Sequence, residues 1–123
     1  MRLGQRAQAT RRYTADDVAA FRELAGAPAG PDGRVPEPLI GALFSYLLGA
    51  ELPGYGTNYL KQEMRFVRPA RVGEPLTASV EITRLRPEKA LVDLATRCVD
   101  AEGRPVCEGR ALVLVRDVGG ASS

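Results

Sequence analysis

Apolar and polar residues alternate along much of the second half of the chain, which is the pattern of half-buried β-strands. One face of the strand predicted at residues 76–83 is apolar and comprises Leu76, Ala78, Val80 and Ile82. One face of the strand predicted at residues 59–66 comprises Leu60, Gln62, Met64 and Phe66. With two further predicted strands at residues 90–99 and 106–115, we expect four antiparallel strands after residue 58.

The last two predicted strands form a hairpin whose turn is centred between Glu102 and Gly103. The register pairs Cys98 with Cys107, Leu94 with Ala111 and Val92 with Val113 on one face, and Arg97 with Glu108, Val99 with Val106 and Leu91 with Leu114 on the other. Opposite charges directly across two strands stabilise their pairing, and a slip of one residue would separate them.

The first part of the chain predicts a short edge strand at residues 6–13 and then a helix. Thr14 is a suitable N-cap, and the acidic residues that follow it favour the positive end of a helix. An apolar stripe at helical spacing comprises Val18, Phe21, Leu24 and Ala25. We expect Gly26 to end this helix and the stripe to pack on the rest of the chain.

Residues 27–36 are rich in proline and glycine and are predicted to be a loop, whereas residues 39–49 are apolar nearly all round. The second pattern is typical of a helix covered on most sides. The predicted fold is α+β, with an antiparallel sheet wrapped around a central buried helix, which is the arrangement of the hot-dog fold. We expect a single domain over residues 1–118 and a flexible tail at residues 119–123.

Composition narrows the possible partners and location. The chain has 123 residues, enough for one domain, and its 17 basic residues are interleaved with 15 acidic ones. We therefore expect no nucleic-acid partner. The longest apolar stretch, residues 39–48, is too short to span a bilayer, and the first residues contain no apolar run of signal-peptide length. The expected location is cytoplasmic, without membrane contact.

The chain contains no histidine and only two cysteines, Cys98 and Cys107. The absence of histidine excludes Ser-His-Asp and Cys-His catalysis and histidine metal ligation. No cysteine spacing predicts a zinc site, and we expect neither a metal nor a cofactor. The two cysteines could form a cross-strand disulfide, although two buried thiols fit a reducing cytoplasm better.

Three segments resemble the MaoC-like (R)-specific enoyl-CoA hydratase/dehydratase family: residues 13–26, 48–60 and 66–76. The resemblance implies a hot-dog fold and an acyl-thioester substrate. In that family a loop with the sequence Asp-x-Asn-Pro-x-His follows the first helix, and its aspartate and histidine activate the water that adds to an enoyl thioester. Backbone N–H groups at the start of the buried helix stabilise the enolate oxygen.

The resemblance breaks at that loop. The aspartate position holds Ala27, the asparagine position Ala29, the proline position Gly30 and the histidine position Asp32. Neither side chain of the catalytic pair is present, and the segment before the buried helix is shortened. This counts against ordinary hydratase activity.

Two carboxylates are candidate bases. Glu37 lies just before the buried helix, where hot-dog thioesterases commonly place a carboxylate that activates water, but it could equally complement only the helix dipole. Asp32 lies in a Pro-Asp-Gly sequence, which favours a solvated turn over a catalytic role.

Other polar residues are weaker candidates for substrate binding: Gly41 and Ser45 in the buried helix, and Tyr55 and Asn58 after it. Packing or turn formation explains each of them as well or better. Arg68, Arg71 and Arg104 could contact coenzyme A phosphates, although scattered arginines are more often solvated.

Three roles remain open for an acyl-CoA or acyl-carrier thioester-binding protein of this kind. The chain could be a divergent hydratase or thioesterase that uses Glu37 or Asp32 as its base. It could be the non-catalytic subunit of a heteromeric dehydratase, paired with a chain that has the aspartate and histidine. It could also bind an acyl thioester without reacting it. An open sheet edge and an incomplete acyl groove favour a homodimer, with that heterodimer as the alternative.

Overall fold

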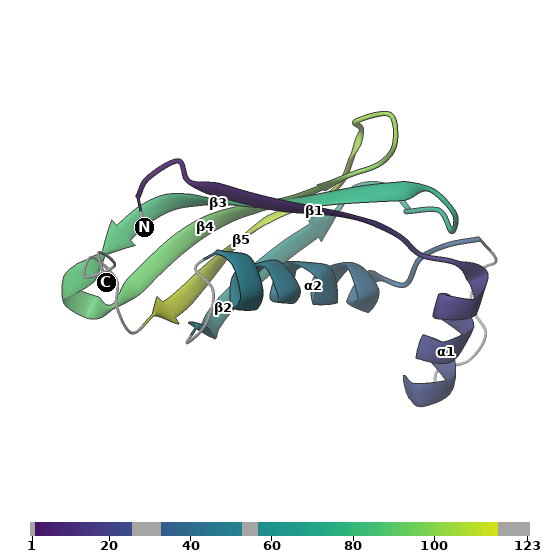
Figure 1. The fold of residues 1–123 in the computed structure, drawn as a ribbon, viewed down its shortest axis with the longest axis horizontal. Helices are drawn as coiled ribbons and strands as arrows, with labels where there is room; N and C mark the ends of the chain where they lie inside the picture. Colours follow the sequence, from purple (N-terminus) through teal and green to yellow (C-terminus); the bar gives the residue numbers. More distant parts are fainter. Residues whose placement is uncertain (1, 26–32, 53–56, 116–123) are drawn as a thin grey trace.

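The computed structural model describes residues 2–25, 33–52 and 57–115, and these residues form five strands and a long central helix (Figure 1). The elements in chain order are β1 (Arg6–Arg12), α1 (Ala15–Ala25), α2 (Glu37–Tyr46), the π-helical turn η1 (Leu47–Glu51), β2 (Thr57–Phe66), β3 (Pro75–Arg86), the 3-10 turn η2 (Pro87–Lys89), β4 (Leu91–Val99) and β5 (Pro105–Val115). All strand pairs are antiparallel, in the order β1-β3-β4-β5-β2. The predicted α+β class and edge position of β1 are confirmed.

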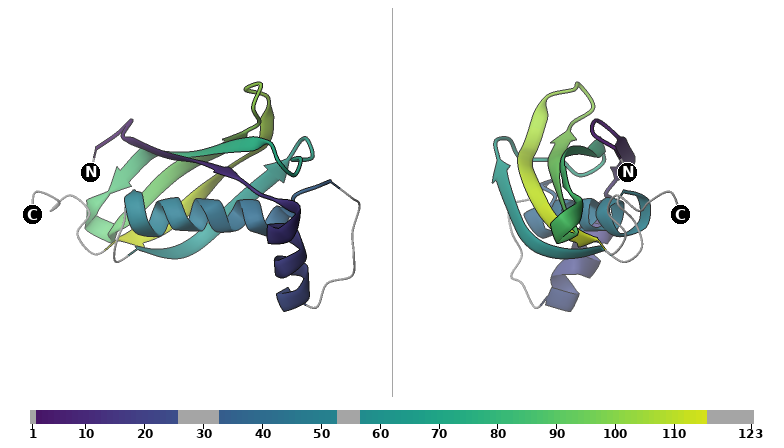
Figure 2. Two further views of the ribbon diagram at one scale, coloured as in Figure 1. Left: turned by 45° about the vertical axis from the view of Figure 1, so that its right-hand side comes forward. Right: turned by 90° about the vertical axis from the view of Figure 1, so that its left-hand side faces the viewer.

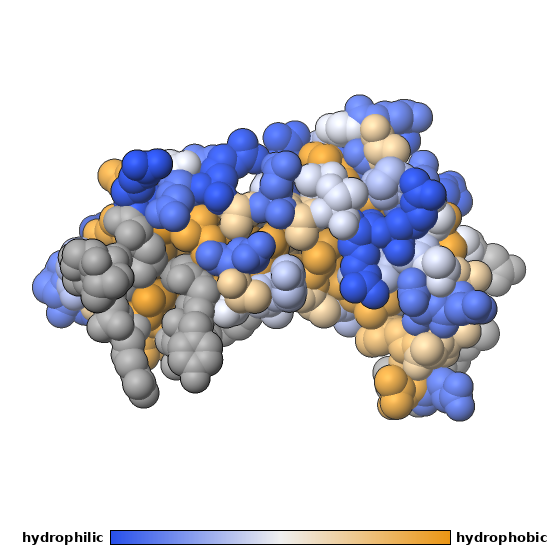
Figure 3. Space-filling model, viewed as in Figure 1, coloured by the Kyte–Doolittle hydropathy of each residue, from blue (hydrophilic) through white to orange (hydrophobic). Residues whose placement is uncertain are grey.

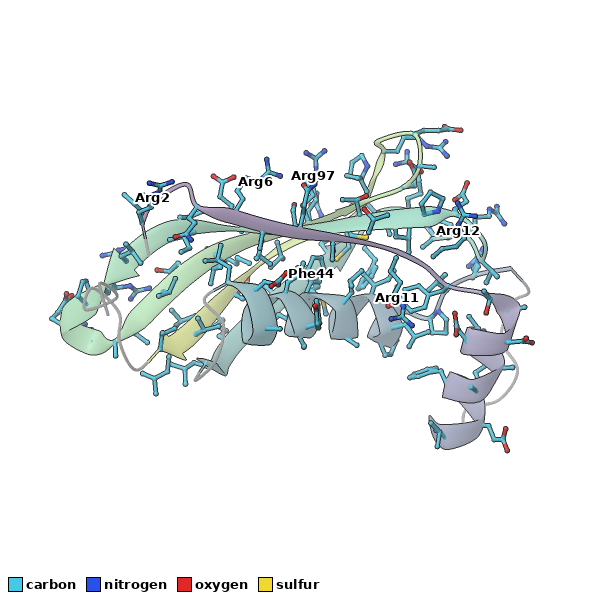
Figure 4. All side chains as sticks on the ribbon, viewed as in Figure 1. Arg2, Arg6, Arg11, Arg12, Phe44 and Arg97 are labelled. Carbon is cyan, nitrogen blue, oxygen red and sulfur yellow. The ribbon has the colours of Figure 1, made fainter. Side chains whose placement is uncertain are left out.

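The sheet curls around α2, which lies on its concave side (Figure 2). Phe44 lies between α2 and the sheet and is fully buried (Figure 4). The apolar face of β3, from Leu76 to Ile82, is buried as predicted. The helix itself is covered on one side only, because Ala42 and Ser45 are exposed and the Tyr46 side chain is 55% exposed. The expectation of burial on most sides is therefore wrong for a single chain.

Helix α1 begins with a reciprocal cap. The N–H of Asp17 donates to Oγ1 of Thr14 at 3.1 Å, and the N–H of Thr14 donates to Oδ2 of Asp17 at 2.8 Å. The predicted cap is confirmed, but the predicted packing is not. Val18 is buried, whereas Leu24 is 91% exposed. The helix points away from the sheet (Figure 1), and its far end presents an apolar surface (Figure 3).

The β4–β5 hairpin has the predicted register from Leu91–Leu114 to Cys98–Cys107. Arg97 and Glu108 form an ion pair at 3.9 Å. The prediction fails at the turn, where a bulge after Cys98 pairs Val99 with Pro105 instead of Val106. A second irregularity, between Tyr59 and Lys61 of β2, interrupts the alternation predicted for that strand.

The two cysteines face each other across β4 and β5 as free, buried thiols. Burial raises the pKa of Cys98 to about 12 and the pKa of Cys107 to about 11, and each is raised further by a neighbouring negative charge. Both thiols are therefore protonated and unreactive near neutral pH.

Asp100, which the sequence pattern did not single out, holds the hairpin turn together. Its buried carboxylate accepts hydrogen bonds at 2.9 Å from the backbone N–H groups of Glu102 and Arg104 and from Nε of Arg104. Burial opposes ionisation of Asp100, but these hydrogen bonds outweigh it and hold its pKa below the usual 3.8.

The Asp100→Asn variant is expected to have a lower Tm than wild type at pH 7, since the neutral amide cannot accept the same set of charge-assisted hydrogen bonds. Because the folded-state pKa is depressed, the stabilisation by Asp100 is present above the unfolded-state pKa and is lost as the pH falls through the folded-state value. The Tm difference between the two proteins should therefore shrink below pH 3.8. Glu102→Gln, in the same turn but exposed, is the control, and an equal Tm loss in that variant would contradict the assignment.

Candidate functional site

A pocket of about 430 Å³ opens at the N-terminal end of α2. It is lined by Arg22, Arg34, Val35, Pro36, Glu37, Ile40, Phe66, Val67, Arg68, Pro69 and Ala70. The segment before α2 is fixed to the β2–β3 connection, because the N–H of Val35 donates to the carbonyl of Ala70 and the N–H of Val72 donates to the carbonyl of Gly33, both at 2.9 Å. These two hydrogen bonds place the start of α2 beside the end of β2.

The pocket is rich in positive charge. Arg22 comes from α1, Arg34 from the segment before α2 and Arg68 from the connection after β2. Nη1 of Arg68 donates to the carbonyl of Pro105 at 2.9 Å, which orients its guanidinium. Within the described part of the chain, no carboxylate lies within 4.0 Å of Arg22 or Arg34. Their charges are available to an anionic ligand.

Glu37 is the first residue of α2 and contributes the pocket's carboxylate. The helix start offers a ligand few backbone donors, because Pro38 has no N–H and the N–H of Leu39 donates to the carbonyl of Pro36 at 3.0 Å. Glu37 is exposed to solvent in the single chain.

A second groove, of about 470 Å³, runs between β1 and α2 and is lined by Ala9, Thr10, Arg11, Tyr13, Leu39, Ala42, Leu43 and Tyr46. The hydroxyl of Tyr13 donates to the carbonyl of Leu39 at 3.0 Å and ties α2 to the end of β1. The Arg11 guanidinium lies 5.0 Å from the centre of the Tyr13 ring. Burial is the main cause that raises the pKa of Tyr13 above 10.0.

Two other predicted site residues, Gly41 and Ser45, do not line the pocket that contains Glu37. A Cβ atom placed on Gly41 would lie 3.4 Å from Cε of Met64, so a small residue here allows α2 to approach β2. Ser45 is exposed further along α2. Asn58 pairs with Leu114 at the start of β2. The start of β2 lies near the C-terminal end of α2, whereas Glu37 begins that helix (Figure 1). Asp32, Tyr55 and the tail at residues 119–123 lie outside the described residues.

Of the arginines suggested as coenzyme A contacts, some line the pocket and others lie outside it. Arg104 is held in the hairpin turn by Asp100 and Glu102, at 2.9 Å and 3.3 Å. The backbone of Arg71 forms a bridge with that of Arg34. Of the three arginines suggested by the sequence, only Arg68 lines the pocket. Arg22 and Arg34 were not identified from the sequence, because nothing in their spacing indicates that α1 and the segment before α2 meet.

The ranges 2–25, 33–52 and 57–115 contain neither a metal-binding cluster nor a membrane-spanning helix. No group of three or more histidine, cysteine, aspartate or glutamate side chains could hold a metal ion there. No helix in these ranges has the length and apolar character needed to cross a membrane.

The sheet wrapped around α2 defines a hot-dog-fold protein, and solved structures agree. The chain is similar to the (R)-hydratase from Aeromonas caviae involved in PHA biosynthesis, with a TM-score of 0.88 and 36% identity over 94% of this chain and 98% of that one. It is also similar to an (R)-hydratase from Pseudomonas aeruginosa in its unliganded form, with a TM-score of 0.85 and 30% identity over 94% of this chain and 82% of that one.

Sequence comparison gives the family. No protein-family model matches the chain. The chain is, however, 36% identical over 126 aligned positions to the (R)-specific enoyl-CoA hydratase of Aeromonas caviae, covering 92% of this chain and 94% of that protein. It therefore belongs to the MaoC-like (R)-specific enoyl-CoA hydratase family.

Proposed function

We propose that this protein binds an acyl thioester of coenzyme A or of an acyl carrier protein and lacks ordinary enoyl hydratase activity. The family relationship supports the ligand class, since relatives of this chain are enoyl-CoA hydratases. The absence of histidine from the sequence supports the lack of activity. Acid/base catalysis loses most of its rate when one of its partners is removed.

The observation that carries the proposal is the basic pocket at the start of α2. Guanidinium groups form short, charge-assisted hydrogen bonds with phosphate oxygens, and both coenzyme A and the carrier-protein prosthetic group have phosphates. Arg22, Arg34 and Arg68 provide such groups. Ile40 and Phe66 give the same pocket an apolar wall on which the uncharged part of a thioester would rest.

We propose that the protein forms a homodimer. Strand β2 is an open edge of the sheet, and the outer side of α2 is exposed. The open edge is costly in a solitary chain, because it leaves backbone donors and acceptors without protein partners. The alternative, a heterodimer with a chain that has the aspartate and histidine, stays a prediction that native mass spectrometry of the purified complex can test.

A second candidate function is a divergent enzyme that uses Glu37, favoured by the position of this carboxylate in the pocket. As a thioesterase, Glu37 would accept a proton from a water molecule while the water oxygen bonds to the thioester carbonyl carbon. The carbon–sulfur bond would then break, and the proton would pass to the leaving thiolate. Asp32 stays a prediction for the same role.

Titration calorimetry with butyryl-CoA tests the binding proposal. Wild type is expected to bind saturably, and the double variant R22A/R34A is expected to bind about 100-fold more weakly. Each of the two lost charge-assisted contacts is expected to cost about 1.4 kcal/mol, which is about tenfold in the dissociation constant. Arg84→Ala removes an exposed arginine that lines neither of the two grooves along α2 and serves as the control. Unchanged affinity in R22A/R34A would place the ligand elsewhere.

A further inference from the structure

The groove between β1 and α2 shares no lining residue with the basic pocket at the start of α2. Its volume of about 470 Å³ is typical of a small-molecule site. The groove lies on the β1 side of the helix, whereas Gly41 of α2 faces Met64 of β2. It is therefore a separate feature of the molecule, with a lining of its own.

Small and apolar side chains form most of this groove. Those of α2 recur every three or four positions and so lie in one stripe along the helix, which comprises Leu39, Ala42, Leu43 and Tyr46. The facing strand contributes the small side chain of Ala9, which leaves the space above the stripe open. A helix rises about 1.5 Å per residue, so the stripe is about 10 Å long, which matches an extended chain of about eight carbon atoms.

Arg11 brings a positive charge to one end of the groove, beside the start of α2 (Figure 4). Its guanidinium lies 5.0 Å from the centre of the Tyr13 ring, and this cation–π contact orients it. Contact with the face of a ring leaves the N–H groups at the edge of a guanidinium available as donors. Among the described residues, no carboxylate lies within 4.0 Å of Arg11.

Two neighbouring hydroxyl groups already have partners. The Tyr13 hydroxyl donates to the carbonyl of Leu39 at 3.0 Å. Oγ1 of Thr10 lies 2.9 Å from Oγ1 of Thr77, with which it forms a hydrogen bond. The guanidinium of Arg11 is thus the strongest donor that this end of the groove offers to a ligand.

We propose that the groove binds a free medium-chain carboxylate, such as octanoate, with its carboxylate on Arg11 and its chain along the stripe of α2. A guanidinium and a carboxylate form two parallel, charge-assisted hydrogen bonds. The chain would cover Ala42 and the Tyr46 side chain, which is 55% exposed. This site is additional to the proposed thioester site and does not rest on it.

The charge of the groove selects a carboxylate over other acyl compounds. A thioester carbonyl is neutral, so a thioester in the same place would leave Arg11 without an anionic partner. Coenzyme A has several negative charges, whereas Arg11 is the single cationic residue among the described residues of the lining. One carboxylate matches one guanidinium.

Titration calorimetry with sodium octanoate tests the site. Wild type is expected to bind octanoate saturably. Butyrate is expected to bind at least about tenfold more weakly, because each buried methylene group tightens binding by up to about fourfold. Neutral 1-octanol, which has the same chain length, is also expected to bind at least about tenfold more weakly. Equal affinity for octanoate and 1-octanol would overturn recognition of the carboxylate.

Arg11→Gln removes the charge and is expected to weaken octanoate binding about tenfold or more. Arg12→Gln is the matched control, because Arg12 is the next residue of β1, is exposed and does not line the groove. Alternation along the strand directs its side chain to the opposite face of the sheet. Both variants lose one positive charge, so an equal loss of affinity in the two would overturn Arg11 as the partner of the carboxylate.

Ala42→Glu places a negative charge in the middle of the groove. Ala42 is exposed and glutamate favours helices, so the fold should be kept. Octanoate binding is expected to weaken at least about tenfold, whereas butyryl-CoA binding should not change, because Ala42 does not line the basic pocket. Ala50→Glu, an exposed position of η1 outside both grooves, is the control. Unchanged octanoate binding in Ala42→Glu would overturn the groove as the site.

The outcomes separate this inference from the proposed function. A wild type that binds butyryl-CoA but not octanoate would overturn the inference and leave thioester binding intact. Octanoate binding that is lost in R22A/R34A and kept in Arg11→Gln would place the carboxylate in the basic pocket and overturn the groove. Octanoate binding that depends on Arg11, in a wild type that does not bind butyryl-CoA, would support the groove and overturn the proposed function.

Discussion

Replacing Gly109 with alanine is expected to destabilise the protein by about 3 kcal/mol or more. Gly109 lies in β5, opposite Met64 of β2 and Thr96 of β4. A Cβ atom at this position would overlap the backbone carbonyl oxygen of Glu63 and would lie 2.9 Å from its carbonyl carbon and 3.0 Å from Cα of Met64. Backbone atoms cannot turn aside as a side chain can, so the two strands would have to separate.

Urea unfolding followed by circular dichroism measures this effect. The control is Gly49→Ala, because Gly49 is an exposed residue in the helical turn η1, and a Cβ atom added there would meet no described atom within 4 Å. That variant is expected to change the free energy of unfolding by less than about 1 kcal/mol. The change should be an increase, because alanine favours a helical turn more than glycine does. Equal stability of Gly109→Ala and wild type would contradict the close approach of β2 and β5.

The Phe44→Ala variant is expected to lose about 3–5 kcal/mol of unfolding free energy. Phe44 is 0% exposed and fills the space between α2 and the concave face of the sheet (Figure 4). Its removal would leave a cavity that the helix cannot close, because α2 is also held by the hydrogen bond from Tyr13 to Leu39.

Tyr46→Ala is the matched control for Phe44→Ala, since both replace an aromatic residue of α2 and Tyr46 is 55% exposed. The control should cost less than about 1 kcal/mol in the same urea experiment. A similar loss in both variants would mean that the buried face of α2 does not dominate the stability of the core.

The strands and most of the β4–β5 register were predictable, because period-two alternation and cross-strand charge pairs are local signals. The bulge that pairs Val99 with Pro105 was not predictable, since alternation alone does not specify an inserted residue. The exposure of Leu24 and of the outer side of α2 was missed for a different reason. An apolar pattern indicates that a face favours burial, but not whether the same chain covers it.

The candidate site was predictable only in part. Glu37 lies in the pocket. It was predictable because a carboxylate at a helix start can be recognised from the proline-rich segment before it. The basic character of the pocket depends on Arg22 and Arg34, which come from segments whose contact is a tertiary feature. Asp100 was missed because its hydrogen bonds depend on the geometry of the hairpin turn.

The central claim is that the protein binds acyl thioesters without ordinary hydratase chemistry. The most direct test measures, in one preparation, the binding of butyryl-CoA, the hydration of crotonyl-CoA and the hydrolysis of a short acyl-CoA panel, with Glu37→Ala beside wild type. We predict saturable binding and no turnover above the uncatalysed rate in either protein. Turnover of crotonyl-CoA by wild type that is lost in Glu37→Ala would contradict this account and would identify Glu37 as the base of a divergent hydratase.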